Sequence, residues 1–359
     1  MSMCKFRTIT SLILTAVIFA ATSCQHKELC YYHPHTAPVR VNVDWSLFTM
    51  EEPTGMTAYA YPIGNVEDKQ LYKFITHNMN SITLDLEVGM FHTVVFNQSE
   101  SEYGTIQFSN LEDYENAQVQ VVPVQSSWYE TKAPGTKVGT EPEWLAIGSA
   151  ENLEVTEEMV AVAEREYLAG MQDVMTKAAG QTVNDLATIT PVSVIKQVEF
   201  NVYGQGLYNL RTVRAALEGM AEGCLLSTGK TTANQVAHTM EEWTVELEEN
   251  DPASGEIKIL LSTFGIPEGH GGTAQENKFS ISCLLVDNKT VVTNDFYVGD
   301  LLAKFKEMDG LDGNIQKVVI NLRLPERLPD VQPMGGSGGG FDAEVDDWGD
   351  EIVTNIPIM

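Results

Sequence analysis

The stretch Val198-Glu199-Phe200-Asn201-Val202, near the middle of the chain, alternates apolar and polar side chains. Successive side chains of a β-strand point to opposite faces, so this alternation predicts a strand with one buried and one solvated face. The stretch ends a longer expected strand, Val192 to Val202, which follows Pro191. Short strands of this kind, when they recur along a chain, are typical of an all-β sandwich.

Similar runs recur on both sides of this stretch, separated by clusters of turn-forming residues. On the N-terminal side the expected strands are Val39 to Trp45, Met56 to Tyr61, Ile82 to Leu86, Phe91 to Phe96, Thr105 to Phe108 and Val119 to Val124. On the C-terminal side they are Trp243 to Leu247, Ile257 to Phe264, Phe279 to Val286, Thr290 to Val298 and Ile315 to Leu322. The chain is therefore expected to be mainly β, with two strand-rich blocks in tandem.

Three segments depart from this recurring pattern of short alternating strands. Apolar residues from Glu157 to Ala179 fall at helical spacing, which predicts one amphipathic helix. Residues 127–150, with Pro134, Gly135 and Pro142, are typical of a long connection. The segment Gly206 to Gly223 suits a helix by its apolar spacing and strand ends by its glycines, so its structure stays open.

These patterns divide the chain of 359 residues into five parts. We expect a lipoprotein signal peptide at 1–23, a polar tether at 24–37, an N-terminal sandwich domain at 38–185 and a C-terminal sandwich domain at 186–329. Residues 330–359 form a glycine-rich linker followed by an acidic tail.

Charge excludes one class of function. The chain carries 50 acidic and 22 basic side chains, for a formal net charge of -28. Each phosphate contact of a nucleic acid needs a lysine or arginine, so no nucleic-acid partner is expected. The same charge repels an anionic lipid surface, and attachment to a membrane must therefore be covalent or hydrophobic.

The N-terminus carries a secretion signal. Lys5 and Arg7 precede a short apolar run from Ile9 to Ala21, which is too short to span a bilayer and is typical of a signal peptide. The run ends in Ala21-Thr22-Ser23-Cys24, which resembles a bacterial lipobox, although Ala21 stands where Leu is usual. We therefore predict that Cys24 is acylated; an ordinary signal peptide with a chance cysteine is the alternative.

The remaining cysteines do not form a disulfide framework. Cys4 leaves with the signal peptide, so Cys30, Cys224 and Cys283 remain beside Cys24. An odd number in a chain of this size does not indicate a framework, and whether any two of them pair stays open.

The C-terminal tail is a candidate strand. Gly335 to Gly340 form a flexible linker, and an acidic run follows it. Beyond the linker, five apolar side chains suit a strand that pairs with a sheet: Trp348, Ile352, Val353, Ile356 and Ile358. Sequence alone leaves open whether that strand pairs within its own chain or with another chain.

No combination of residues points to catalysis. Gly335-x-Ser337-x-Gly339 matches a nucleophile elbow formally, but a glycine linker supplies neither the strand nor the helix that an elbow needs. No Cys/His spacing suits zinc, and there is no Walker loop or dinucleotide fingerprint. We expect no enzyme activity, no cofactor and no metal site.

Several stretches resemble a known family. They are Lys27 to His35 leading into Val39 to Trp45, Gly206 to Leu210, Gly219 to Gly223, and Gly340 to Trp348. Together they are similar to lipoproteins of Gram-negative anaerobes that are related to fimbrillin-associated anchor proteins. The resemblance implies two tandem transthyretin-like Greek-key β-sandwich domains, on a lipid-anchored outer-membrane protein of the cell surface and its type V pili.

The resemblance also implies a function. The expected role is a non-catalytic pilus subunit, anchor or accessory adhesin, whose partners are other pilus subunits, outer-membrane lipid and surface ligands of host or bacteria. Assembly would use strand addition, in which an extended segment pairs with an open sheet edge. A surface lipoprotein that binds glycans is the alternative, because Trp and Tyr rings stack on sugars. Whether the subunit is anchor, shaft or tip stays open.

Overall fold

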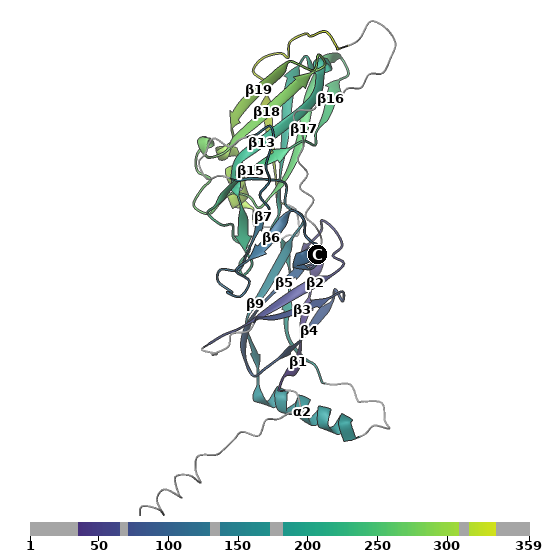
Figure 1. The fold of residues 1–359 in the computed structure, drawn as a ribbon, viewed down its shortest axis with the longest axis vertical. Helices are drawn as coiled ribbons and strands as arrows, with labels where there is room; N and C mark the ends of the chain where they lie inside the picture. The colour runs from purple at the N-terminus through teal and green to yellow at the C-terminus, as the bar shows by residue number, and fades with distance from the viewer. Residues whose placement is uncertain (1–34, 65–70, 130–136, 173–181, 309–315, 335–359) are drawn as a thin grey trace, which may run out of the picture.

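The computed structural model describes residues 35–64, 71–129, 137–172, 182–308 and 316–334. Strands dominate these residues, so the prediction of a mainly β chain is confirmed. The molecule is elongated, with the N-terminal strands at one end and the C-terminal strands at the other (Figure 1).

Two sheets enclose the core of the N-terminal half. The smaller sheet has the order β10-β1-β4, formed by β1 (Ala37–Val43), β4 (Ser81–Leu86) and β10 (Asn184–Ile189). The larger has the order β11-β9-β5-β2-β3, formed by β2 (Met56–Pro62), β3 (Tyr72–Thr76), β5 (Gly89–Asn97), β9 (Ala146–Val155) and β11 (Val192–Ser193). β1 is parallel to β10 and antiparallel to β4.

Alternation explains how this core forms. Val39 and Val41 of β1 are fully buried and lie opposite Leu84 and Ile82 of β4. They share one apolar cluster with residues of β2, β5 and β9, so the two sheets pack face to face. Helix α2 (Glu157–Gln172) covers the end of this cluster with Ala163. The predicted helix is thus found, although residues 173–181 lie outside the described residues.

Two further sheets form the C-terminal half. One has the order β16-β17-β12-β20, formed by β12 (Lys196–Gln205), β16 (Thr244–Glu248), β17 (Asp251–Thr263) and β20 (Lys317–Arg323). The other has the order β19-β18-β13-β15-β8, formed by β8 (Lys137–Gly139), β13 (Leu210–Ala221), β15 (Gln235–Met240), β18 (Lys278–Leu285) and β19 (Val291–Tyr297).

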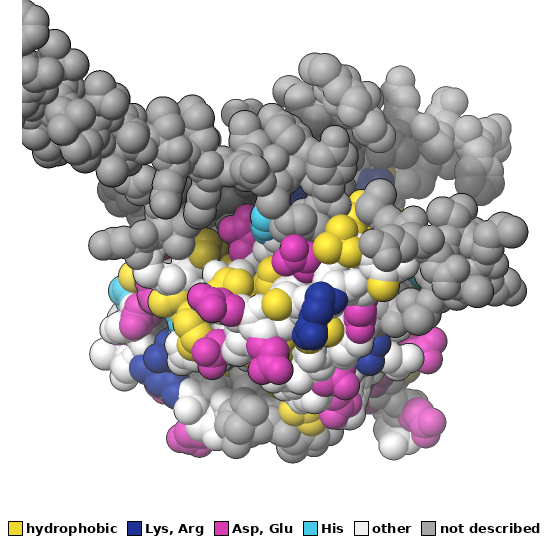
Figure 2. Space-filling model, turned by 90° about the horizontal axis from the view of Figure 1, so that it is seen from below, with side chains coloured by type: hydrophobic (Ala, Val, Ile, Leu, Met, Phe, Trp, Pro, Cys, Tyr) yellow, Lys and Arg dark blue, Asp and Glu magenta, His cyan; other side chains and the backbone are white. Residues whose placement is uncertain are grey.

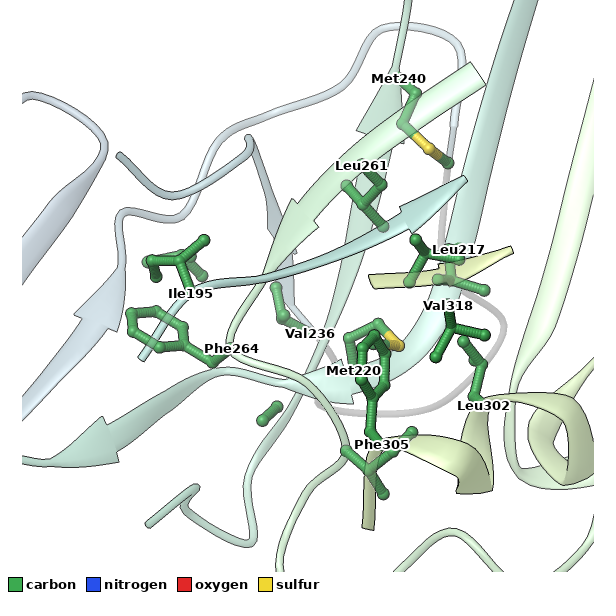
Figure 3. Close-up of a cluster of buried hydrophobic side chains, with 14 of the residues drawn as sticks. Ile195, Leu217, Met220, Val236, Met240, Leu261, Phe264, Leu302, Phe305 and Val318 are labelled. Atoms are coloured by element: carbon green, nitrogen blue, oxygen red, sulfur yellow. The ribbon is translucent and has the colours of Figure 1, made fainter. Parts of the chain in front are cut away.

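The inward side chains of these two sheets form a continuous core. Phe200 of β12 stacks on Phe279 of β18, with ring centroids 3.9 Å apart and planes 12° apart. Leu302 and Phe305, from the short helices α3 (Gly299–Leu302) and η5 (Ala303–Glu307), close one end of the core. Figure 3 shows them beside Met220, Val236 and Val318. Val198, Phe200 and Val202 are all buried, as their alternation predicts.

A three-stranded sheet, β14-β7-β6, joins the two halves. It consists of β6 (Ile106–Ser109), β7 (Gln118–Val121) and β14 (Gly223–Leu225), and β14 comes from the C-terminal half. In return β8, from the N-terminal half, pairs with β15. One strand of each half therefore pairs with a strand of the other half. Strand β10 pairs with β1 of the N-terminal half, and β12 begins the next sheet. Whether the predicted units 38–185 and 186–329 fold independently remains a prediction.

The remaining described helices are single turns: η1 (Trp45–Leu47), η2 (Glu100–Glu102), η3 (Leu207–Asn209) and η4 (Ala274–Glu276). The segment 206–223, left open by its sequence, contains η3 and strand β13. Its helical spacing is overridden because Gly219 has φ of +83° and lies where β13 shifts register against β15. A side chain at Gly219 would meet the carbonyl oxygen of Glu276 at 2.2 Å.

The expectation of a plain connection over 127–150 is wrong in part. This region contains β8 and the start of β9. Ala146 and Ile147 of β9 are buried and pair with β11, and β8 pairs with a strand about 100 positions further along the chain. Local sequence signals miss strands that are this short or that begin among prolines and glycines, because their pairing partners are distant.

Candidate functional site

The residues that the sequence singled out lie outside the described residues. This holds for Cys24 and for the tail residues Trp348, Ile352, Val353, Ile356 and Ile358. Their roles therefore stay predictions. Over the described ranges, no three His, Cys, Asp or Glu side chains are grouped as metal ligands would be. None of the helices in those ranges has the length and apolar character to cross a membrane.

The two described cysteines are buried free thiols. Cys224 and Cys283 are fully inaccessible to solvent and are not joined to each other. Burial raises the pKa of the Cys283 thiol to about 12 and that of Cys224 further still. Because the thiolate is the reactive form, these groups are inert packing side chains at neutral pH.

The features that can bind a partner are the sheet edges, since an edge strand has one row of unpaired backbone groups. In the sheet β19-β18-β13-β15-β8, one edge is closed: Val124 N–H donates to Val138 O of β8 at 2.8 Å. The opposite edge is β19, which pairs along seven residues with β18 without a bulge. Among the described residues no strand pairs with its other side.

Two hydrogen bonds show which residues of β19 face the open side. Leu285 N–H donates to Thr290 O at 2.9 Å, at one end of the strand. Val298 N–H donates to Asn277 O at 3.0 Å, at the other end. Thr290 and Val298 thus point toward β18, and successive residues alternate. The residues whose N–H and C=O point outward are Val291, Thr293, Asp295 and Tyr297.

The side chains of β19 also suit an added strand. Val291 and Tyr297 are 49% and 58% exposed on the outer face. On the inner face, Val292 and Phe296 are only partly buried where they pack against the core. A strand added beside β19 would bury more apolar surface on both faces, and burial of apolar surface is favourable.

Two other edges, β16 and β3, carry features that discourage strand addition. Strand β16 presents Glu246 and Glu248 and shifts register against β17 between Leu247 and Glu248. Strand β3 is short and carries Lys73, which forms an ion pair with Glu100. Charges and bulges on edge strands oppose pairing with another chain. β19 pairs regularly along its seven residues and is one of the open edges of the described residues.

The outer face of the same sheet is covered by a segment from the N-terminal half. Trp128 donates from Nε1 to Glu241 at 3.1 Å, and the Arg214 guanidinium lies 5.8 Å from its ring centroid. The Tyr129 hydroxyl donates to Glu218, whose carboxylate also pairs with Lys278 at 2.9 Å. These contacts join Trp128 and Tyr129 to residues 113 and 89 positions further along the chain, so no local sequence motif indicates them.

The surface around the opposite end of the molecule is mixed. Figure 2, which views the molecule from below, shows acidic, basic and apolar side chains interspersed on the described part of that face. Isolated apolar side chains on a surface are ordinary and do not mark a binding site.

His238 gives the fold a dependence on pH. It is fully buried on β15, where Nδ1 lies 3.0 Å from Thr140 O and Nε2 lies 3.5 Å from Thr263 Oγ1. Burial lowers the pKa of His238 to about 4, because the charged imidazolium loses its hydration. In the unfolded chain the same group titrates near 6.5.

We expect His238 to destabilise the protein as the pH falls from about 6.5 toward 4. In that window the unfolded chain binds a proton that the folded chain does not, so stability present above pH 6.5 is progressively lost. The expected loss between pH 7 and pH 5 is about 2 kcal/mol of unfolding free energy. It is measured by urea unfolding at both pH values, with His238→Gln as the control that lacks the titrating group. An equal pH dependence in both proteins would contradict the assignment.

One protein family and several solved structures are similar to this chain. The family model described as Domain of unknown function (DUF5119) matches residues 23–241. No curated protein is significantly similar in sequence. The crystal structure of a proposed adhesin from Bacteroides ovatus ATCC 8483 is similar at a TM-score of 0.54 and 15% identity, over 87% of this chain and 99% of that one.

Two more solved structures are similar at lower scores. One is a proposed adhesin from Bacteroides thetaiotaomicron VPI-5482, with a TM-score of 0.48 and 11% identity over 81% of this chain and 92% of that one. The other is the fimbrial anchor protein Mfa2 from Porphyromonas gingivalis, with a TM-score of 0.44 and 12% identity over 80% and 90%. The similarity to the proposed adhesin from Bacteroides ovatus shows that the two chains share a fold, in line with the resemblance that the sequence predicted.

Proposed function

The chain belongs to the DUF5119 family, and we propose that it is a non-catalytic, lipid-anchored subunit of a cell-surface pilus, acting as anchor or accessory adhesin. Its partners would be other pilus subunits, and its two halves would be transthyretin-like sandwich domains. One observation carries the proposal: a fold shared over 87% of the chain with a proposed adhesin presents a regular open edge at β19.

The physical basis of assembly is strand addition. An extended segment of another chain can satisfy the outward N–H and C=O groups of an edge strand, and side-chain pockets then select the partner. The acidic chain supports such specific contacts over nonspecific ones, since a net charge of -28 opposes indiscriminate self-association. The acylated Cys24 would hold the assembly at the outer membrane.

The proposal is tested in the cells that produce the protein. We expect an affinity-tagged full chain to co-purify with the pilus shaft protein, and electron microscopy to show altered pili in cells that lack the gene. A glycan array probed with the same purified chain is the control for the alternative role. Glycan binding without shaft protein in the purified material would contradict a pilus subunit and favour a glycan-binding lipoprotein.

A further inference from the structure

The last described residues bring the chain to the β18–β19 turn. Leu324 N–H donates to Tyr203 O and Leu328 N–H to Gln205 O, both at 2.8 Å, which holds this segment along β12. It then crosses the end of the core, and Met334 N–H donates to Val286 O at 3.1 Å. Val286 directly follows β18, so the described chain ends beside the turn that leads into β19 (Figure 1).

We propose that residues 352–358 of the same chain add to the open edge of β19 as an antiparallel strand, with Asn355 opposite Asn294. This inference concerns the free chain and needs neither lipid nor pilus; during the proposed pilus assembly, a strand of another subunit would displace the tail from β19. The edge is the regular, open β19 described above, and the occupant is the part of the tail with the apolar side chains Ile352, Val353, Ile356 and Ile358.

The reach of the chain permits this pairing. β19 has 7 residues and is therefore roughly 23 Å long. The stretch 335–351 separates Met334 from Ile352 and can span on the order of 55 Å when extended. An antiparallel strand must start near Tyr297, at the far end of β19 from Met334. The stretch 335–351 can cover the length of β19 and still turn back.

Proline decides which side of the added strand faces β19. Pro357 has no N–H, so a strand that contains it must turn that position away from its only partner. By alternation, the backbone groups that face β19 then belong to Ile352, Thr354, Ile356 and Ile358. A slip of one residue would aim Pro357 at the edge and lose a hydrogen bond.

The register follows from the exposed side chains of β19. With Asn355 opposite Asn294, Ile352 lies opposite Tyr297 and Ile358 opposite Val291. Both exposed apolar side chains of the edge are then covered, and cross-strand apolar pairs stabilise sheets. A slip of two residues in either direction places an isoleucine, Ile352 or Ile356, opposite Asp295 instead.

Covalent connection favours the tail of the same chain over that of another copy. A segment tethered through a stretch of this length and glycine content is present at about millimolar effective concentration near its own β19 edge. A second copy reaches that concentration only in a dense assembly. Occupied in this way, the edge is also protected against unspecific pairing with other strands.

The proposal is tested by disulfide formation in the purified full chain carrying Asn294→Cys, Asn355→Cys and Cys30→Ser. Opposite residues that do not exchange hydrogen bonds have Cα atoms about 4.5 Å apart, which suits a disulfide. We expect mild oxidation to join them within a monomer, seen as a linked peptide by mass spectrometry. The matched control pairs Asn294→Cys with Thr354→Cys, whose side chains point to opposite faces, and should react at least 10-fold more slowly.

A second variant tests whether the disulfide requires pairing of the tail with the β19 edge or only proximity of the tail to that edge. Thr293→Pro removes one outward N–H of β19 and the exposed side-chain hydrogen bond between Thr293 and Ser282, but none of the backbone hydrogen bonds to β18, so the fold should persist by near-ultraviolet circular dichroism. Added to the Asn294/Asn355 cysteine pair, it should slow the disulfide by at least 10-fold. Equal rates for the matched pair and its control, unchanged rates in the proline variant, or disulfides only between two copies would each overturn the proposal.

Discussion

Replacing Cys24 with alanine is expected to abolish lipid labelling of the protein and to release it from membranes into the soluble fraction. The apolar run before Ala21-Thr22-Ser23-Cys24 is predicted to direct secretion, and the cysteine thiol is the only group in that motif that can carry a thioether-linked lipid. One acyl chain gives only marginal attachment, so stable anchoring requires the several chains of a bacterial lipoprotein. The loss should therefore be nearly complete.

The measurement is incorporation of a labelled fatty acid, followed by separation of membranes from soluble protein. Cys30→Ala is the matched control, since Cys30 lies six positions further along and should not be acylated. It should label and fractionate as the unaltered protein does. Normal membrane attachment of the Cys24→Ala protein would show that another feature holds the chain at the membrane.

Truncating Phe200 to alanine is expected to lower the free energy of unfolding by about 3–5 kcal/mol, the range for large aromatic side chains in packed cores. Phe200 is fully buried on β12 and stacks on Phe279 of the facing sheet, at a centroid distance of 3.9 Å. Its removal leaves a cavity between two sheets whose backbones are held by strand pairing, so the cavity cannot collapse completely.

Leu260→Ala is the matched control for Phe200→Ala. Leu260 lies on the neighbouring strand β17, opposite Glu199, but points outward and is 43% exposed. Its truncation should cost less than about 1 kcal/mol, since little apolar surface returns to water. Denaturant unfolding measures both variants. Equal losses would mean that the interior of the two sheets is not the main source of their stability.

Local pattern predicted much of the fold because strand and helix periodicities are properties of neighbouring residues. The alternation in Val198, Phe200 and Val202 correctly predicted a strand with one buried face. The helical spacing after Glu157 correctly predicted α2. Where local signals conflicted, as around Gly219, the structure was decided by a register shift and by contact with Glu276.

The candidate interface, the open edge of β19, was harder to predict from the sequence than the strands themselves. The run Thr290 to Val298 was recognised as a strand, but its sequence does not settle whether that strand is an edge or an interior strand. Its alternation of exposed and partly buried residues, with Asp295 on the outer face, is the one local hint. An edge is defined by which strand lies beside it, and that depends on the whole topology.

By itself, the sequence indicated that this chain is mainly β and that it carries an amphipathic helix after Glu157, and its charge predicts no nucleic-acid partner. Tertiary structure alone decided the pairing of strands. Arg40 of β1 lies beside Asp185 of β10, 145 positions away, and β7 pairs with β14 from the other half of the chain. Alternation states which face of a strand is buried, but every strand with a similar pattern is an equivalent partner until the chain folds. Only the packed core, which admits one arrangement of side chains at native density, selects among those partners and leaves β19 at the edge.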